Sequence, residues 1–148
     1  MLNTLRFVSF LFTALALAVA LAHALELPNK ITLSREDYLT VQQIYRGWAL
    51  LGIIEIAALL STLALAFKVS RDPKVFGLTL SALFCIAAAL AVFFLFTYPV
   101  NQQTANWTRL PDNWADLRKQ WEYSHATRAG LFLIALNLQI LTVLRRNE

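Results

Sequence analysis

Four apolar segments dominate this chain and limit the folds that are open to it. They lie near residues 5–24, 47–67, 75–98 and 126–144. A helix of about 20 apolar residues spans a hydrocarbon core about 30 Å thick, so each segment has the length of a membrane-crossing helix. Because 58% of the residues are hydrophobic and only 15% are charged, no second, water-soluble domain is expected. The sequence predicts an all-α integral membrane protein, a single transmembrane domain of residues 1–148 folded as a four-helix bundle.

The two longer connections, residues 26–46 and 99–125, are predicted to be largely helical and to form a crown outside the membrane. Ser34 is followed by acidic residues in the pattern of a helix N-cap, and a helix is predicted from there through Gly47 into the second apolar segment. A second cap at residues 112–114 predicts a helix that continues to the end of the fourth segment. Two long helices are therefore expected to protrude on the extracytoplasmic side.

Proline is predicted to end the two shorter helices, the first at Pro28 and the third at Pro99, because it interrupts helical hydrogen bonding. The first segment also fits a secretory signal peptide, with Ala22-His23-Ala24 as a cleavage site. A retained helix is favoured because the chain continues directly into Leu25-Glu26-Leu27-Pro28, which has the pattern of a helix exit. Cys85 is the only cysteine, which excludes an intramolecular disulfide and a Cys-x-x-Cys redox pair.

Basic residues are concentrated in the short segments on one side of the predicted membrane. Dense basic charge in short loops stays cytoplasmic, so both termini are predicted to lie in the cytoplasm and the protein in the cell (inner) membrane. The lipid bilayer is its expected partner. The net charge of +4 does not indicate nucleic acid, because the cations are scattered at membrane edges rather than grouped with exposed aromatic residues. The basic residues of this side are Arg6, Lys68, Arg71, Lys74, Arg145 and Arg146.

Both histidines lie at the same end of the predicted bundle, each with a glutamate three residues away. His23 and Glu26 close the first apolar segment, and Glu122 and His125 precede the fourth. Residues three apart share a helix face, so each pair presents a carboxylate and an imidazole together. Arg118 lies one turn before Glu122 on the same face. These five residues are predicted to be catalytic, with acid–base roles for the two pairs.

Aromatic, basic and amide side chains are expected to surround these pairs and to bind a flat, hydrophobic small molecule. Glu55 lies about 12 Å below the outer edge of the second span. Ionisable groups at such depth usually face the bundle interior with a partner, here Asn137 or Gln139. Interfacial tryptophans and arginines also anchor membrane proteins without binding anything, so a structural role stays open. The predicted substrate-binding residues are Tyr45, Glu55, Asn101, Trp107, Trp114, Trp121 and Arg128.

A metal site is a sharper interpretation of the same residues. Facing Glu-x-x-His motifs bind iron or manganese in di-metal carboxylate bundles. Here His23, Glu26, Glu122 and His125 are enough ligands for one transition metal and too few for a dinuclear centre. The expected cofactor is therefore either none or a single transition-metal ion.

Four motifs together resemble a family of small four-span membrane proteins, and the resemblance covers nearly the whole chain. They are H-A-L-E-L-P-x-K at residues 23–30, Y-P-V-N at 98–101, P-x-N-W at 111–114 and R-x-x-W-E-x-x-H-A at 118–126. Much of that family has no assigned function. Its named members are the anthrone oxygenases of aromatic polyketide pathways.

The resemblance implies a four-span fold and an oxidation by dioxygen. In this chain His125 or His23 would remove the acidic C–H proton of an anthrone. Arg118 and Asn101 would stabilise the resulting enolate oxygen. The flat rings would be held by tryptophan side chains, namely Trp107, Trp114 and Trp121.

The favoured function is a membrane-bound oxidoreductase or oxygenase that acts on a hydrophobic, anthrone- or quinol-like molecule. One alternative is a non-enzymatic lipid or small-molecule binding protein with the same pocket. Another is a structural subunit whose crown docks a partner protein. The sequence carries no nucleotide-binding fingerprint, haem-attachment motif or nucleophile elbow, and it does not indicate an oligomeric state.

Overall fold

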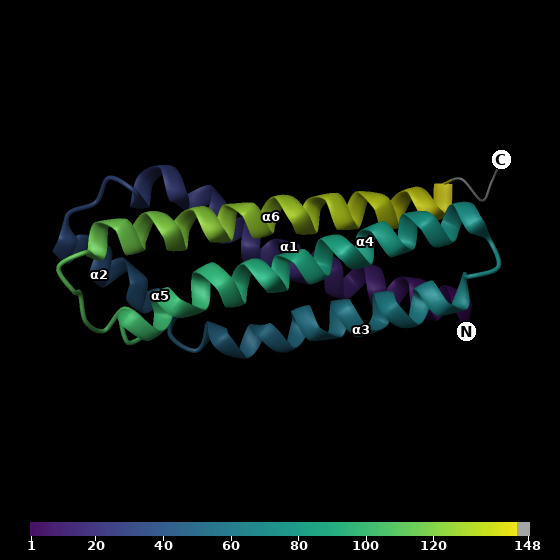
Figure 1. The fold of residues 1–148 in the computed structure, drawn as a ribbon, viewed down its shortest axis with the longest axis horizontal. Coiled ribbons are helices and arrows are strands. Elements are labelled where there is room, and N and C mark those ends of the chain that lie inside the picture. The colour runs from purple at the N-terminus through teal and green to yellow at the C-terminus, as the bar shows by residue number, and fades with distance from the viewer. Residues whose placement is uncertain (145–148) are drawn as a thin grey trace.

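The computed structural model describes residues 1–144; Arg145 and Arg146 of the basic side lie outside the described residues. This part of the chain is almost entirely helical and contains no strand. Figure 1 shows a long bundle with the N-terminus, the α3–α4 turn and the end of α6 at one end, and short helices at the other. The elements are α1 (Leu2–Lys30), α2 (Arg35–Gln42), the 3₁₀ turns Gln43–Tyr45 and Trp48–Leu51, α3 (Gly52–Lys68), α4 (Pro73–Val92), the π-helical turn Phe93–Thr97, α5 (Tyr98–Gln103) and α6 (Trp114–Leu144).

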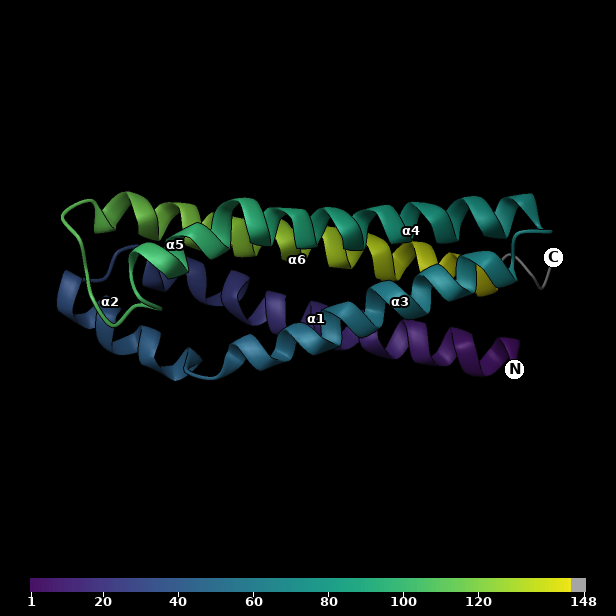
Figure 2. The same cartoon turned by 60° about the horizontal axis from the view of Figure 1, so that its bottom comes forward.

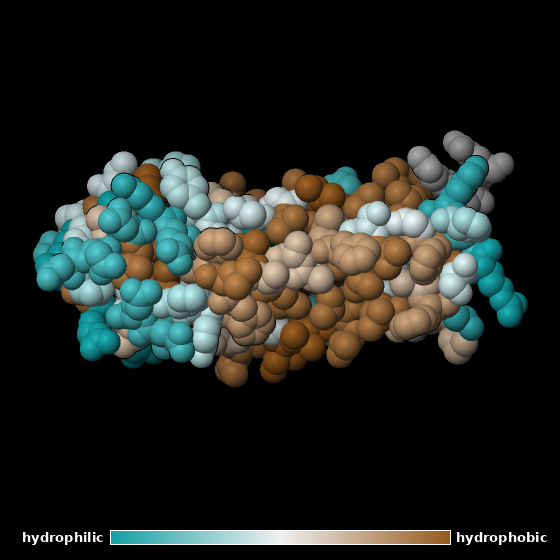
Figure 3. All heavy atoms as spheres, in the orientation of Figure 1, coloured by the Kyte–Doolittle hydropathy of each residue, from teal (hydrophilic) through white to brown (hydrophobic). Residues whose placement is uncertain are grey.

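Four helical stretches are long and apolar enough to cross a membrane: Leu2–Lys30, Trp48–Lys68, Pro73–Gln103 and Trp114–Leu144. Each corresponds to one of the apolar segments found in the sequence. On the face drawn in Figure 3, a hydrophobic band covers the middle of the bundle, between two more hydrophilic ends. The prediction of an all-helical chain with four helices long and apolar enough to cross a membrane is confirmed for the described residues.

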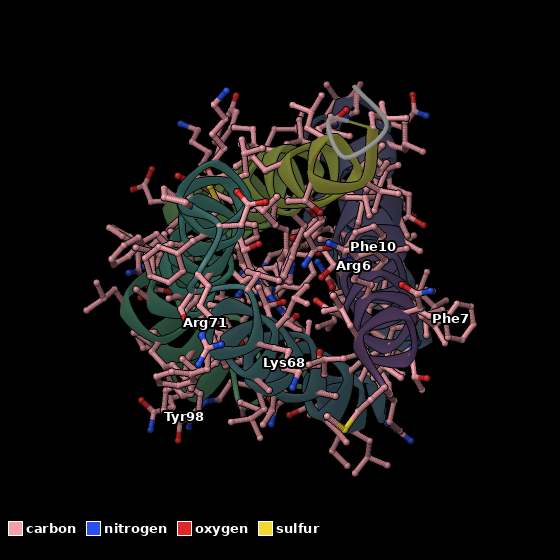
Figure 4. The ribbon with its side chains drawn as sticks, turned by 90° about the vertical axis from the view of Figure 1, so that its right-hand side faces the viewer. Arg6, Phe7, Phe10, Lys68, Arg71 and Tyr98 are labelled. Carbon is pink, nitrogen blue, oxygen red and sulfur yellow. The ribbon has the colours of Figure 1, made fainter. Side chains whose placement is uncertain are left out.

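The end that holds the N-terminus and the α3–α4 turn carries the cations Arg6, Lys68 and Arg71. Figure 4, seen from this end, shows Arg6 pointing into the bundle and Phe7 pointing away from it. The exposed fractions agree, at 8% for Arg6 and 66% for Phe7. A membrane helix faces lipid on one side and other helices on the other. Its apolar side chains are therefore expected on the exposed side, and its polar side chains on the buried side.

The middle of the bundle is packed mainly with alanine, and we call this level the alanine layer. All four long helices contribute to it, and each member is at most 4% exposed. Small side chains allow membrane helices to approach closely. The alanine layer consists of Ala16, Ala20, Ala58, Ala82, Ile86, Ala89, Ala129, Phe132 and Ala135.

One amide joins three helices between the alanine layer and the end with the N-terminus. Gln139 of α6 places its Nε2 atom 3.0 Å from Ser9 Oγ and 3.1 Å from Thr13 Oγ1 of α1. The same atom lies 3.0 Å from Thr62 Oγ1 of α3. All four side chains are fully buried. Buried polar contacts of this kind hold membrane helices together.

Neither proline ends its helix, contrary to the prediction. Pro28 lies in the last turn of α1, where a missing N–H group disturbs few remaining bonds, and the helix continues to Lys30. Pro99 follows the π-helical turn Phe93–Thr97 and lies in the first turn of α5. The wider turn shifts the hydrogen-bond register before the proline, and proline fits the first turn of a helix. Helical backbone therefore continues through Pro73–Gln103.

The second long helix is interrupted, whereas an unbroken one was predicted. Its start is confirmed, because Ser34 Oγ accepts a hydrogen bond of 3.1 Å from the Asp37 N–H group. The helix stops near Gly47, whose φ of 88° lies in the left-handed region that glycine adopts without steric cost. Helical structure resumes at Trp48. The other predicted long helix is confirmed, since α6 continues unbroken over 31 residues.

The short helices and the first turns of α6 form the crown, at the end opposite the N-terminus. Figure 2 shows α2 and α5 at this end of the bundle. Their side chains enclose a small core of their own. It consists of Tyr38, Val100, Trp107, Leu117 and Trp121. This core fixes one wall of the cavity described next.

Candidate functional site

A cavity of about 530 Å³ lies between the crown and the alanine layer. Its volume is within the range of roughly 300–1,000 Å³ that is typical of small-molecule sites. Residues of all four long helices and of the crown line it. Eight of the residues singled out in the sequence are among them: His23, Tyr45, Glu55, Asn101, Trp107, Trp121, His125 and Arg128.

The two histidines meet inside this cavity, because α1 and α6 pack against each other. The ring centroids of His23 and His125 are 4.0 Å apart, with the planes inclined by 32°. Trp121 flanks both rings, at 5.0 Å from His23 and 4.2 Å from His125. Tyr45 adds a further ring 4.4 Å from His23. Aromatic walls of this kind favour stacking of a flat ring system.

A buried ion pair lies at the side of the cavity nearest the alanine layer. Arg128 of α6 binds Glu55 of α3 through its Nη2 atom, and both side chains are at most 8% exposed. The predicted partners of Glu55 were wrong. Asn137 donates to a carbonyl of its own helix, and Gln139 binds hydroxyl groups of α1 and α3. At this depth an opposite charge stabilises a carboxylate more than an amide does. Arg128 also lies about two to three turns nearer to Glu55 along α6 than Asn137 or Gln139.

The same arginine determines the tautomer of His125. Arg128 Nη1 lies 3.2 Å from His125 Nδ1. A guanidinium group only donates hydrogen bonds, so Nδ1 accepts and the proton of the neutral ring lies on Nε2. His23, in contrast, has a buried Nδ1 atom with no hydrogen-bond partner. Of the two predicted bases, His23 is therefore the one whose Nδ1 atom is not held by a hydrogen bond.

Three consecutive residues of the loop after α5 have left-handed backbone conformations. The φ angles are 48° at Ala105, 54° at Asn106 and 60° at Trp107. Such conformations cost of order 1–3 kcal/mol each outside glycine and are concentrated at functional sites. Asn106 and Trp107 both line the cavity. The strained loop therefore positions two of its walls.

A second polar cluster, centred on Lys30, lies in the crown beside the cavity. Lys30 Nζ is 3.3 Å from Glu26 Oε2, 3.2 Å from Glu122 Oε1 and 2.7 Å from Tyr45 Oη. Tyr38 donates to Glu122 Oε1 at 2.9 Å, and Tyr45 donates to Glu26. Lys30 and Glu122 are almost completely buried. We call these five residues the Lys30 cluster; it neutralises charges that would otherwise be buried alone.

The two tyrosines of the Lys30 cluster remain neutral donors at ordinary pH. Burial raises the pKa of Tyr38, and the negative charge of Glu122 and the hydrogen bond to it raise that pKa further. Burial also raises the pKa of Tyr45, with added contributions from its hydrogen bond to Glu26 and from the charge of Glu26. Both phenols therefore keep their protons well into the alkaline range.

The glutamates of the two predicted His/Glu pairs belong to the Lys30 cluster, and they do not line the cavity. Residues three apart on a helix differ by about 60° around its axis, which is enough to give Glu122 and His125 different neighbours. Arg118 is also remote from the cavity lining. It donates to the Leu33 carbonyl at 2.8 Å and stacks 4.6 Å from the ring of Trp114. Arg118 and Trp114 therefore hold the crown together.

The four predicted metal ligands are divided between two clusters. Within residues 1–144, no group of three or more His, Cys, Asp or Glu side chains is placed to share a metal ion. His23 and His125 face each other as stacked rings, while Glu26 and Glu122 bind Lys30. The predicted four-residue metal site is therefore not assembled.

No role was predicted from the sequence for Lys30, Tyr38 or Phe93. Lys30 lies four residues after Glu26, which is a favourable helical spacing for an ion pair, but the predicted helix end at Pro28 concealed it. Phe93 lines the cavity, and its ring lies 5.1 Å from the guanidinium carbon of Arg128. Nothing in the sequence distinguishes Phe93 from the other phenylalanines of the same span.

Comparison of the chain with protein-family models, with curated proteins and with solved structures finds no match. The cavity itself is therefore the evidence for a function. It combines aromatic walls, an imidazole with an uncommitted nitrogen and a guanidinium held by a carboxylate. Together these groups are suited to binding a flat molecule, accepting a proton from it and stabilising the anion that results.

Proposed function

We propose that the protein is a membrane-bound oxidoreductase that binds a flat, hydrophobic, anthrone- or quinol-like molecule in this cavity and oxidises it with dioxygen. The observation that carries this proposal is the presence of His23, with its uncommitted nitrogen, and the buried guanidinium of Arg128 in one cavity. A base beside a fixed positive charge favours deprotonation of a weak acid. The resemblance to the family that includes the anthrone oxygenases supports the same chemistry.

In the proposed mechanism His23 accepts the proton of the acidic C–H group of the substrate. The Nε2–H group of His125 and the amide nitrogen of Asn101 donate to the developing enolate oxygen. Asn101 is oriented for this by Trp121, whose Nε1 atom donates to Asn101 Oδ1 at 2.9 Å. Arg128 holds His125 in the tautomer that donates. These roles replace the one that the family resemblance implied for Arg118.

The oxidation balances without a cofactor. The carbanion transfers an electron to dioxygen, and recombination of the two radicals forms a C–O bond. Protonation by the imidazolium of His23 gives a hydroperoxide. Loss of the second C–H proton and cleavage of the O–O bond then yield a carbonyl group and one molecule of water. One dioxygen is consumed for each methylene group converted to a ketone.

We further propose that the protein lies in the cell (inner) membrane with its termini in the cytoplasm and the crown outside. The support is the basic charge of Arg6, Lys68, Arg71 and Lys74 at the end opposite the crown. A reporter enzyme that is active only outside the cytoplasm, fused after the last residue, should be inactive. An active reporter would reverse the orientation.

Oxygen uptake by the purified protein in lipid nanodiscs, with an anthrone as substrate, tests the proposed reaction. His23→Ala should lower the rate by about 10²–10⁴-fold, which is the usual contribution of a positioned base. Tyr123→Phe, at an exposed position of α6, is the matched control and should leave the rate unchanged. An uptake no faster than that of protein-free nanodiscs, or an active His23→Ala variant, would overturn the proposal.

A non-enzymatic role in binding a lipid or small molecule is the second candidate. Its support is the set of aromatic walls around the cavity, which needs no proton transfer to hold a flat ligand. Ligand-dependent quenching of tryptophan fluorescence without oxygen uptake would favour this candidate. In that case Trp121→Ala should weaken binding, and His23→Ala should leave it nearly unchanged.

A further inference from the structure

The cavity has two chemically different halves. Toward the crown its lining is polar, with Gln43, Arg46, Asn101, Asn106 and Thr108. Toward the alanine layer it includes apolar residues of the membrane-crossing helices, among them Val19, Ile56, Leu90 and Phe94. The histidines lie between the two, and the Arg128–Glu55 ion pair lies at the side of the apolar residues. A ligand that fills both halves therefore needs a polar, aromatic head and an apolar extension.

The apolar half reaches the surface of the bundle between α3 and the π-helical turn after α4. Two residues that line the cavity are also strongly exposed there, Ile56 at 45% and Phe94 at 59%. These two side chains border the cavity and lie on the surface, so they mark the rim of an opening on this side; exposed lining residues of the crown, such as Arg46 and Asn106, mark another at the polar end. Gly52, at the start of α3, belongs to the same lining and has no side chain to close it.

The surface around this rim is apolar. Ile53 is 72% exposed on α3, and Leu95 is 66% exposed on the π-helical turn. Both positions belong to stretches apolar enough to cross a membrane. Exposed apolar surface at this level is covered by lipid, so the opening faces acyl chains rather than water.

Irregular backbone on both sides accounts for the gap. The left-handed turn at Gly47 and the 3₁₀ turn Trp48–Leu51 precede α3. On the facing side the π-helical turn Phe93–Thr97 widens the end of α4. Two regular helices would pack along their whole lengths, whereas these two diverge where the cavity lies. π-helical turns inside helices often mark functional sites.

We infer that the cavity takes its ligand from the lipid phase, and that this ligand is an aromatic or quinol-type molecule with a long alkyl or prenyl tail. The head occupies the level of His23 and Arg128, and the tail leaves through the opening beside Gly52, Ile56 and Phe94 into the bilayer. The identity of the head rests on the proposed function, whereas the opening and the tail rest on the shape and chemistry of the cavity.

Gly52→Phe tests the inference by filling the opening. A Cβ atom at Gly52 meets no heavy atom within 4 Å, and the backbone there is helical, so a side chain is accepted without strain. Gly130→Phe is the matched control, because it adds the same group to another open, exposed helix position that does not line the cavity. Both variants, and the natural protein, are placed in lipid nanodiscs.

The probes are a decyl-substituted dimethoxy-methyl-benzoquinone and its parent without the tail, and binding is measured by quenching of tryptophan fluorescence. Gly52→Phe should weaken binding of the decyl probe by about tenfold, equivalent to roughly 1.4 kcal/mol. It should leave the tail-less probe unchanged, and Gly130→Phe should change neither. The inference would be overturned if Gly52→Phe weakened binding of both probes equally or weakened binding of neither. It would also be overturned if the natural protein did not bind the decyl probe. Because the readout is binding, it is independent of oxygen uptake.

Discussion

At the residue scale, Arg128 connects the groups on which the proposed chemistry depends. Its guanidinium binds Glu55, lies against His125 Nδ1 and packs over the ring of Phe93. Both side chains of the Arg128–Glu55 pair are almost completely buried. A buried pair of this kind is stable only while both partners are present, because removal of one leaves the other charge uncompensated.

Glu55→Gln should therefore destabilise the folded protein by about 3–5 kcal/mol, since it leaves the guanidinium of Arg128 unpaired. The double variant Glu55→Leu with Arg128→Met removes both charges and should be more stable than Glu55→Gln alone. The free energy of unfolding is measured by titrating the protein in mild detergent with sodium dodecyl sulfate. A double variant less stable than Glu55→Gln would show that the two charges act independently.

At the scale of elements, Tyr38 is the most deeply buried contact between α2 and α6. The helix has eight residues, fewer than the 12–15 or so that an isolated helix needs in water. Tyr38 is its fully buried anchor, with its hydroxyl group on Glu122 and its ring 5.0 Å from that of Trp107. The crown on this side of the cavity is therefore held by a neutral phenol.

The raised pKa of Tyr38 makes this attachment sensitive to alkaline pH. The folded state binds the phenolic proton more tightly than the unfolded state, so this stabilisation is complete below the unfolded pKa of about 10 and is lost as pH rises above it. Stability should fall by about 1.4 kcal/mol per pH unit there for each such tyrosine. Thermal unfolding between pH 8 and 11 should show a shallower alkaline loss for Tyr38→Phe than for the natural protein. Equal slopes would contradict this role of Tyr38.

Helix positions were more predictable than helix breaks. Apolar length alone located the four spans, and Ser34 signalled the start of α2 correctly. The breaks depend on contacts and register that no local pattern encodes. Pro99 is accommodated by a π-helical turn that no feature of the sequence indicated. Gly47, read as part of a helix, instead adopts a left-handed conformation.

At the scale of the whole molecule, the sequence predicted which end of the bundle holds the polar side chains. It did not predict which of them line the cavity and which bind one another in the crown. Eight predicted residues do line one cavity, because helical periodicity and depth bring them to one level. Glu26, Glu122 and Arg118 lie at the same end of the bundle and nonetheless do not line the cavity. Lys30 binds Glu26 within α1 and Glu122 across to α6, and the Leu33 carbonyl accepts from Arg118. Spacing along α6 alone cannot reveal the partners of Glu122 and Arg118.

The alanine layer also has an electrical consequence. Along each of the four long helices, the residues of this level separate the cavity from the half of the bundle where Gln139 lies, and all of them are apolar and at most 4% exposed. They offer neither a titratable group nor a hydrogen-bond chain along which a proton could hop. Any proton that His23 takes up or releases is therefore exchanged on one side of the layer alone. If the proposed reaction takes place in the cavity, its turnover would therefore carry no proton through the bundle to the other side.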